Sequence, residues 1–566
     1  MSLETHSRIV RALAERGYNA EREAVTLLAG ATDPEAAVAA VVESTPDDAL
    51  RITADRVRRA LDTDPPVPDP GGVDDPASTA SDSAATEDRA SGASKTSVST
   101  PEKNDENPTT ELGGAVEMEG SSGEPKGSSE SESVGSGSAG PASTAVQNSR
   151  AASASASTGD SVDRSPQPAD ISGDITGRST GTGEYGQFVT TFRDRYERLS
   201  KLLGGRVNHR PATAIDAMPG GSDAEMIGLV NDIRSTASGH WLIELEDTTG
   251  TFPALVMKDR DIAELVDDLL LDECIAVQGT LADDGGIIFV DSLFFPEVPR
   301  TFRPSTADRH VQAALVSDVH VGSQEFMADA WNRFADWLHT EEAEHVEYLL
   351  IAGDMVEGVG VYPDQDEELD IVDIFEQYEA FSEHLKAVPG DMEIVMIPGN
   401  HDAVRLAEPQ PGFDEELRSI MSAHDARITG NPSTVTIEGV SVLMYHGVSL
   451  DEVIAELPAD KASYDEPHKA MYQLLKKRHV APKYGGKMRL APEEKDYLVI
   501  DEVPDVFHTG HVHKLGWGKY HNVLAVNSGC WQAQTAFQKK VNIDPDVAHA
   551  PIVDLDTLNM TVRKFA

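Results

Sequence analysis

Apolar runs alternate with helical segments over the C-terminal half of the chain. Six runs have the length and composition of buried strands and end in glycine or a polar residue: VQAALVS, EYLLIAG, EIVMIPG, SVLMYHG, PDVFHTG and VLAVNSG. Between them, apolar residues recur at helical spacing over residues 331–338 and 374–385. The pattern predicts a layered α/β domain with buried sheets over residues 306–566.

Residues 185–305 show a different pattern, in which one helix precedes several short strands. The segment FVTTFRDRYERLSKLL has helical spacing, and a short helical piece separates the third strand from the fourth. Five strands with a helix in that place predict an OB-type barrel. The few aromatic residues suit a barrel core, so we assign no DNA-binding platform here. The predicted strands cover residues 226–233, 240–250, 251–257, 273–281 and 287–295.

The N-terminal third divides into two parts. Residues 1–62 predict a small helical domain, because Asp33-Pro34 and Thr45-Pro46 are helix-start signals and the apolar run AAVAAVV follows the first. Residues 63–184 are dominated by Ser, Gly, Ala, Thr, Asp, Glu and Pro, and contain no aromatic residue. Such a segment buries too little apolar surface to offset chain entropy, so we expect a disordered acidic linker.

The chain is strongly acidic. Its 566 residues include 47 Lys and Arg against 97 Asp and Glu, a net charge of −50. An acidic tail explains part of this charge, and adaptation to a very salty cytoplasm explains the rest, since charges are screened within roughly 3 Å at 1 M salt. We interpret the charge as a halophilic adaptation, and it does not exclude a nucleic-acid partner.

Cysteine content and hydropathy bear on the compartment. Cys274 and Cys530 are too few and too far apart for a disulfide framework or a zinc site. The N-terminus lacks an apolar leader, and no stretch reaches the roughly 18 apolar residues of a membrane span. We expect a soluble, cytoplasmic protein without membrane contact.

Polar clusters follow five of the predicted strands. Because ligand sites form at the carboxyl ends of strands in open α/β sheets, clusters at five such ends should converge. GNHD and GHVH are the most specific of them, whereas DxH or GD alone is common in turns. The clusters contain Asp318 and His320; Asp354; Asn400, His401 and Asp402; His446; and His511 and His513.

The donor atoms of these clusters suit two divalent metal ions. Two carboxylates, one amide oxygen and several imidazoles make a mixed set that is typical of Mn, Fe or Zn. A carboxylate can bridge two ions about 3.5–4 Å apart, and the centre then stays positively charged. Such a centre can hold a phosphate during an in-line displacement. We expect Mn²⁺, with Fe, Zn and Mg as alternatives.

The array DVH, GD, GNHD, HG and GHVH resembles that of the calcineurin-like metallophosphoesterase superfamily. Its wider contexts, among them SDVHVGS, IAGDMVEGVG and GHVHKLG, resemble the small subunits of archaeal family D DNA polymerases, and the order of the parts agrees. The resemblance covers the chain except the linker and is strongest over residues 310–530. It implies an α/β fold with a four-layer, two-sheet sandwich, and a proofreading 3′→5′ exonuclease.

The resemblance also implies a role for each residue of the array. The metal ligands form two sets of three and one bridging residue: Asp318, His320 and His513; Asn400, His446 and His511; and Asp354. His401 would stay uncoordinated, orient the scissile phosphate and protonate the leaving oxygen as a general acid. Asp402 has two open interpretations, as the residue that orients His401 or as a turn cap. No ligand is missing, so we expect an active metal-dependent exodeoxyribonuclease.

No polymerase signature occurs in the chain, so DNA synthesis would reside in a partner. By the resemblance, that partner is the large catalytic subunit in a heterodimer, and the substrates are DNA 3′ ends. Two alternatives remain open, a phosphatase or phosphodiesterase for a small substrate and a non-catalytic scaffold. The OB-type barrel argues against the first, and the complete ligand set argues against the second.

Residues 469–489 hold seven Lys and Arg and no Asp or Glu. This reversal of charge indicates either one basic helix face or a contact with DNA or with the large subunit. We favour DNA contact, because basic clusters supply affinity for phosphates. The residues concerned are Lys476, Lys477, Arg478, Lys483, Lys487 and Arg489.

Overall fold

The computed structural model describes residues 3–61 with short gaps, 164–179, 183–362, 365–421, 425–540 and 542–566. Most of the predicted linker, up to residue 163, and the predicted helix start at Thr45-Pro46 lie outside the described residues or border them. Among the described helices, none has both the length and the apolar character needed to cross a membrane.

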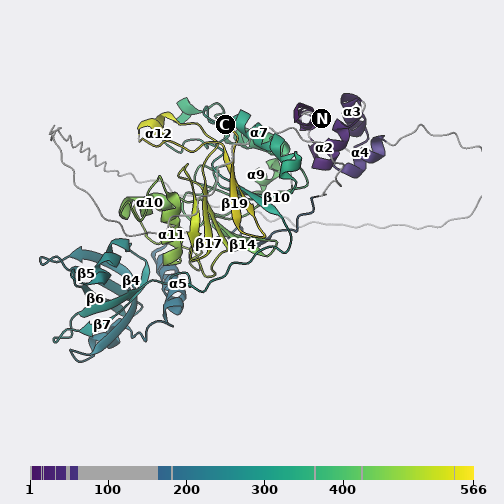
Figure 1. Ribbon diagram of the computed structural model, residues 1–566. Helices are drawn as coiled ribbons and strands as arrows, with labels where there is room; N and C mark the ends of the chain where they lie inside the picture. The colour runs from purple at the N-terminus through teal and green to yellow at the C-terminus, as the bar shows by residue number, and fades with distance from the viewer. Residues whose placement is uncertain are drawn as a thin grey trace, which may run out of the picture. The chain divides into compact units, whose positions relative to one another are not determined.

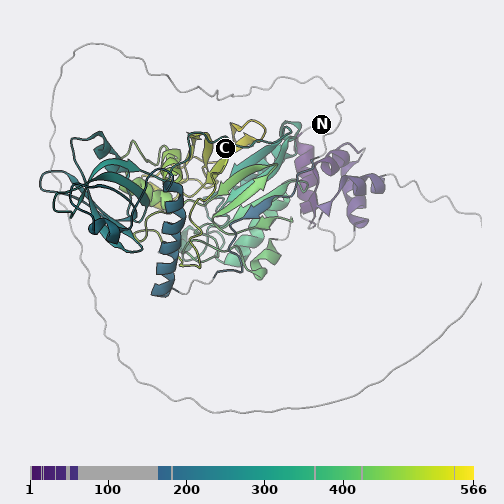
Figure 2. The same ribbon diagram turned by 90° about the horizontal axis from the view of Figure 1, so that it is seen from below.

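Among the described residues of the N-terminal part, which is purple in Figure 2, four helices surround a small apolar core. They are α1 (Leu3–Ala14), α2 (Arg22–Ala29), α3 (Pro34–Glu43) and α4 (Ala54–Leu61), and two short strands, β1 (Asn19–Ala20) and β2 (Arg51–Ile52), pair in parallel beside them. The helix start at Asp33-Pro34 is confirmed, since the Asp33 carboxylate accepts a hydrogen bond from Ala36 N. Leu13, Val25 and Val41 are fully buried in this core.

A long helix and a closed five-stranded barrel follow (Figure 1). The helices are α5 (Tyr185–Leu203) and α6 (Ala212–Asp216), and the barrel order is β4-β5-β6-β8-β7. All five predicted strands are confirmed, and the helical piece between the third and the fourth is the 3₁₀ helix η1 (Asp261–Asp268). The strands are β4 (Asp223–Ser235), β5 (Trp241–Asp247), β6 (Gly250–Val256), β7 (Cys274–Leu281) and β8 (Ile288–Phe294).

Two six-stranded sheets form the C-terminal part. The first has the order β12-β11-β10-β9-β18-β19, and the second has the order β16-β17-β15-β14-β13-β3. The first contains β9 (Gln312–Val316), β10 (Val346–Ala352), β11 (Glu393–Ile397), β12 (Arg427–Ile428), β18 (His549–Asp554) and β19 (Asn559–Lys564). The second contains β3 (Asp170–Ser172), β13 (Ser433–Ile437), β14 (Val440–Met444), β15 (Val506–Thr509), β16 (Leu515–Tyr520) and β17 (Val523–Ser528).

The two sheets share one apolar core, because alternate residues of a strand face opposite sides. Tyr348 and Leu350 of β10 pack with Val442 and Val526 of the second sheet. Leu349, the intervening residue, packs instead with helices on the outer face of the first sheet. Each sheet therefore has one face in the common core and the other against helices.

The helices that cover the sheets carry apolar stripes. The predicted helical segments 331–338 and 374–385 are confirmed as parts of α7 (Ala328–Leu338) and α8 (Ile374–Lys386), which cover the first sheet. On the second sheet lie α10 (Ser449–Glu456) and α11 (Pro467–Lys477), near β14 and β17 (Figure 1). Two shorter helices are α9 (Glu415–Ile420) and α12 (Ala536–Lys540), and two 3₁₀ helices are η2 (Glu341–Ala343) and η3 (Gln365–Glu368).

The prediction that residues 63–184 form a disordered linker is wrong for residues 164–179. In this segment β3 pairs antiparallel with β13 at the edge of the second sheet. The buried Arg164 guanidinium donates hydrogen bonds to the carbonyl oxygens of Leu338 and Ala343. The prediction rested on amino-acid composition, which shows how much apolar surface a segment can bury. This segment is instead held by backbone pairing and by one buried cation, and composition reveals neither.

Candidate metal centre

The polar clusters lie where five strands end. β9, β10 and β11 run parallel in one sheet, and β14 and β15 run parallel in the other, so the carboxyl ends within each sheet lie at one edge. Asp318 and His320 follow β9, Asp354 follows β10, and Asn400 to Asp402 follow β11. His446 follows β14, and His511 and His513 follow β15. The structure brings these side chains together from both sheets.

The turns that carry these residues have left-handed backbone. The φ angles are 52° at Asp318, 57° at His320, 52° at Asp354, 72° at His511 and 53° at His513. For residues other than glycine such angles cost about 1–3 kcal/mol each, and they cluster at functional sites. The strand ends therefore store strain in order to aim these side chains at one point.

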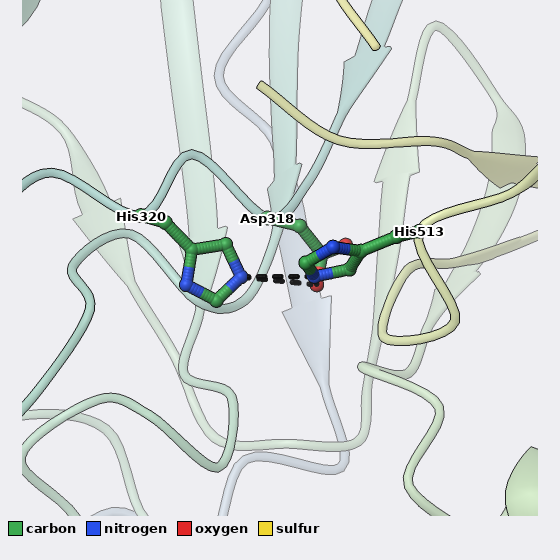
Figure 3. Close-up of side chains that lie close together, drawn as sticks. All are labelled: Asp318, His320 and His513. Carbon is green, nitrogen blue, oxygen red and sulfur yellow. Dashed lines mark hydrogen bonds and ion pairs between the residues drawn. The ribbon is translucent and has the colours of Figure 1, made fainter. Parts of the chain in front are cut away.

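One group of three donors consists of Asp318, His320 and His513. His320 Nε2 lies 3.0 Å from His513 Nε2, and Asp318 Oδ1 lies 3.5 Å from the latter nitrogen. Figure 3 shows the two imidazoles pointing toward one another, with the Asp318 carboxylate beside the His513 ring. The three donor atoms lie within 4.8 Å of one another, and all three residues are buried. This spacing allows one cation to contact all three.

A second group consists of Asp354, His446 and His511, whose donor atoms also lie within 4.8 Å of one another. Asp354 Oδ2 lies 3.2 Å from His446 Nε2, and Asn400 Oδ1 lies 3.0 Å from the same nitrogen. Asp354 Oδ2 is also 3.9 Å from His320 Nε2. The Asp354 carboxylate therefore lies between the two groups, in the place of a bridging ligand.

Several of these imidazoles contact neighbouring residues through the ring nitrogen that points away from the centre. His446 Nδ1 lies 2.8 Å from the carbonyl oxygen of Ala352, and His513 Nδ1 lies 2.8 Å from Gln538 Nε2. His320 Nδ1 lies 2.9 Å from Glu357 Oε2. With one ring nitrogen anchored in this way, the other faces the centre.

Glu357 was missed by the sequence analysis. Its buried carboxylate also accepts a hydrogen bond from Gln532 Nε2 (2.6 Å), and its backbone oxygen lies 2.7 Å from His401 Nδ1. Glu357, His320 and His401 form a third group of donors within 4.8 Å. The available signal was an acidic residue three positions after Asp354 in the run GDMVEG.

Charge within the centre keeps the carboxylates ionised. Burial raises the pKa of Asp354, but the positive charges of His446 and His401 outweigh it and hold the pKa well below its usual value. Burial lowers the pKa of His446, but Asp354 raises it to about 10. Burial likewise lowers the pKa of His320, whereas Glu357 raises it to about 9. The imidazoles thus face strong negative potential, which also attracts metal cations.

Asp402 caps the turn. Its Oδ2 accepts a hydrogen bond from Gly399 N (2.8 Å) and its Oδ1 accepts one from the Tyr378 hydroxyl (3.0 Å). Burial and the nearby Asp354 raise its pKa to about 7. The nitrogen His401 Nδ1 is held by Glu357 O instead. Of the two interpretations left open, these contacts favour the turn cap.

The basic segment divides into two parts, and the first has a different role from the one predicted. The Lys477 side chain is fully buried, 3.2 Å from Glu273 Oε2. Lys476 Nζ lies 2.7 Å from Asp268 Oδ2, and the buried Arg478 donates to the carbonyl oxygen of Ile500. For Lys476, Lys477 and Arg478 the DNA-contact prediction is corrected, because internal partners neutralise or bury all three charges.

The second part of the basic segment is less buried. Lys483 Nζ is 2.7 Å from carboxylate oxygens of both Glu452 and Glu456. Lys487 Nζ is 3.4 Å from Asp451 Oδ2, which lies 3.7 Å from His511 Nε2. Arg489 is exposed. DNA contact by Lys483, Lys487 and Arg489 stays a prediction.

A pocket of about 630 Å³ lies elsewhere, between α5, the barrel and the loop at Tyr484. Tyr185, Phe188 and Phe192 line it. Among the described residues, none of the three donor groups contributes to its lining.

Comparisons with known proteins identify relatives of this chain. Residues 313–515 match the family model for the B-type subunit of DNA polymerases alpha and epsilon. The DNA polymerase II small subunit of Halobacterium salinarum is 63% identical over 566 residues, which is 100% of both chains. The small subunit from Archaeoglobus fulgidus is 44% identical over 380 residues, covering 66% of this chain and 76% of the relative. That of Methanocaldococcus jannaschii is 40% identical over 393 residues, covering 68% of this chain and 66% of the relative.

Proposed function

The chain belongs to the family of archaeal DNA polymerase II small subunits, and on that premise we propose that it is the proofreading 3′→5′ exonuclease of the polymerase. The observation that carries the proposal is the meeting of seven donor residues from five strand ends, with Asp354 between two groups. In this proposal the two sheets and their helices form the four-layer metallophosphoesterase sandwich, and the closed barrel is of the OB type. The name of the relatives also supports a larger partner, the catalytic subunit.

The residues present fit two divalent metal ions. Asp318, His320 and His513 would hold one ion, and their donor atoms already lie within 4.8 Å of one another. Asn400, His446 and His511 would hold the second, and Asp354 would contact both. Mixed oxygen and nitrogen donors suit Mn²⁺, Fe²⁺ or Zn²⁺ better than Ca²⁺, and we propose Mn²⁺. When bound, two such ions would supply Lewis acidity and neutralise charge at the scissile phosphodiester.

His401 is positioned to move a proton. Its Nδ1 is held by the carbonyl oxygen of Glu357, which leaves Nε2 for the substrate. Its ring centroid lies 4.9 Å from that of His320, and its side chain keeps 18% exposure. As a water molecule forms a new bond to phosphorus, a proton on Nε2 would pass to the leaving oxygen of the P–O bond that breaks.

The test is degradation of DNA from its 3′ end. The full chain, alone and with the large subunit, is incubated in molar KCl and Mn²⁺ with a labelled single strand and with a mismatched primer terminus. Stepwise loss of 3′ nucleotides that vanishes in Asp354→Asn is the expected result. Hydrolysis of bis-p-nitrophenyl phosphate without degradation of DNA would identify a small-substrate phosphodiesterase. Inactivity on both would leave a scaffold for the large subunit.

A further inference from the structure

Helix α12 connects the metal centre to the surface. Its Gln538 side chain is buried against His513 Nδ1 at 2.8 Å, and the segment before it is tied to the centre by Trp531 N, which donates to the carbonyl oxygen of Asp318. Other side chains of this helix lie in solvent. Phe537 keeps 53% exposure, and Lys539 and Lys540 are exposed as well.

Phe537 stacks on a second aromatic residue, Tyr362, which comes from a distant part of the chain. The two ring centroids are 6.2 Å apart and the planes differ by 26°. The Tyr362 ring also lies 6.5 Å from the ring of His401. Its hydroxyl oxygen lies 3.3 Å from a carboxylate oxygen of Glu357 and 3.2 Å from one of Glu368, and either can accept its single proton. Tyr362 is thereby anchored to the same Glu357 that holds His320, so the aromatic pair has a defined position beside the centre.

We propose that Tyr362 and Phe537 form a stacking site for the base of the 3′-terminal nucleotide, and that Lys539 and Lys540 face the phosphates of that strand. The proposal rests on the proposed nuclease function. Aromatic stacking is available to every base, which suits an enzyme that must remove any terminal nucleotide. The site adjoins His401, so a base held there would place its own phosphodiester at the metal centre.

The surroundings favour a nucleic acid over an apolar protein segment. Among the described residues, no ion pair is found for the ammonium groups of Lys539 and Lys540, in a chain whose net charge is −50. Two adjacent cations beside an exposed aromatic ring complement a strand that carries both phosphates and bases. A lone exposed phenylalanine would be unremarkable, but this one stacks on Tyr362, whose ring lies 6.5 Å from that of the catalytic candidate His401.

The direct test uses a single strand with 2-aminopurine as its 3′ base, bound to the full chain in EDTA, where fluorescence quenching reports stacking without turnover. Phe537→Ala should abolish most of the quenching and weaken binding roughly fivefold or more, whereas Phe537→Trp should preserve both. Phe289→Ala, which removes a phenylalanine of 40% exposure on the barrel, is the matched control and should behave as wild type. Thermal unfolding of each variant verifies the fold.

A second arm separates stacking from general binding. Wild type should prefer an intact 3′ terminus over an abasic one, and Phe537→Ala should lose that preference. Equal loss of affinity for both ends, or unchanged quenching, would overturn the stacking site. So would weaker assembly with the large subunit together with unchanged binding of 3′ ends. If wild type and Phe537→Ala degrade DNA equally in Mn²⁺, the nuclease function stands and the stacking site is refuted. If quenching depends on Phe537 but no DNA is degraded, the nuclease function is refuted and the stacking site stands.

Discussion

At the scale of single residues, the candidate ligands depend on contacts that lie outside the centre. His320, His446 and His513 each have one ring nitrogen held by another residue, so their other nitrogens converge with little freedom. The left-handed backbone at Asp318 and Asp354 aims their carboxylates at the same point. Such strain is tolerated only where surrounding contacts enforce it, which here are the buried strands on either side.

Replacement of His401 should separate catalysis from metal binding. In His401→Ala, bound Mn²⁺ per chain should stay at the wild-type value, because His401 belongs to neither proposed ligand set, while turnover should fall about 10²-fold or more. Metal content is measured by mass spectrometry after dialysis, and turnover is measured on a labelled 3′ end. In Asp354→Ala both quantities should fall. Full activity of His401→Ala would exclude the general-acid role.

Glu357 should contribute to metal affinity without being a ligand in either proposed set. In Glu357→Gln the negative charge that faces His320 Nδ1 is lost, so Mn²⁺ affinity should fall roughly tenfold or more. Calorimetric titration with Mn²⁺ measures this directly. Glu368→Gln is the matched control, since Glu368 contacts the Tyr362 hydroxyl but none of the ligands. Equal affinities for both variants would contradict the assigned role.

At the scale of elements, a buried ion pair holds helix α5 against the part of the chain that contains the two six-stranded sheets. Arg195 Nε lies 2.6 Å from Asp496 Oδ2, and both side chains are at most 1% exposed. Arg195 also donates to the carbonyl oxygen of Pro482, and His479 Nε2 lies 3.0 Å from the same Asp496 oxygen. Burial raises the pKa of Asp496, but Arg195 and His479 outweigh it and lower the pKa.

Breaking this pair should destabilise the protein. Arg195→Met leaves the Asp496 carboxylate buried with only its remaining partners, so the free energy of unfolding should fall by about 3–5 kcal/mol. Because the folded pKa of Asp496 is depressed, its stabilisation is present above the ordinary carboxyl value and is lost as the pH falls. Denaturant titration at neutral pH measures the change. Arg193→Met, an exposed position on the same helix, should change stability little.

At the scale of the whole molecule, the chain is acidic, whereas the proposed substrate is a polyanion. The net charge of −50 would repel DNA at low salt, whereas molar salt screens that repulsion within roughly 3 Å. In the proposed function, local contacts between the candidate metal centre and phosphate then matter more than the total charge. Lys476 and Lys477 of the basic segment form ion pairs within the chain, so these two cations stabilise the fold.

Stability should therefore depend on salt. As KCl is lowered from molar concentration to about 0.1 M, the Debye length grows to roughly 10 Å and repulsion among acidic side chains increases, so the melting temperature should fall. Scanning calorimetry across a KCl series measures the effect. An equal series in a neutral osmolyte distinguishes charge screening from general hydration. A melting temperature that is independent of KCl would exclude a halophilic adaptation of the surface.

The local pattern of residues in the sequence was sufficient to predict several features of this protein. The five barrel strands, the helices α7 and α8 and the start of α3 are confirmed, because periodicity and capping depend on residues close together in the chain. The polar clusters at strand ends were found for the same reason, since each lies within a few residues of an apolar run. Their motif array also indicated the family, which the relatives show.

Features that depend on contacts between residues far apart in the sequence were decided only by the tertiary structure. β3 was missed because its order comes from pairing with β13, more than 250 positions away. Lys477 was predicted to contact DNA because its ion-pair partner, Glu273, lies about 200 positions earlier and does not enter a count of charges over residues 469–489. Gln538 and the stacked pair Tyr362 and Phe537 come close to the candidate site residues through folding alone. Local sequence determines which elements form and which chemistry they carry, whereas burial and long-range contact decide which charges stay available to a substrate.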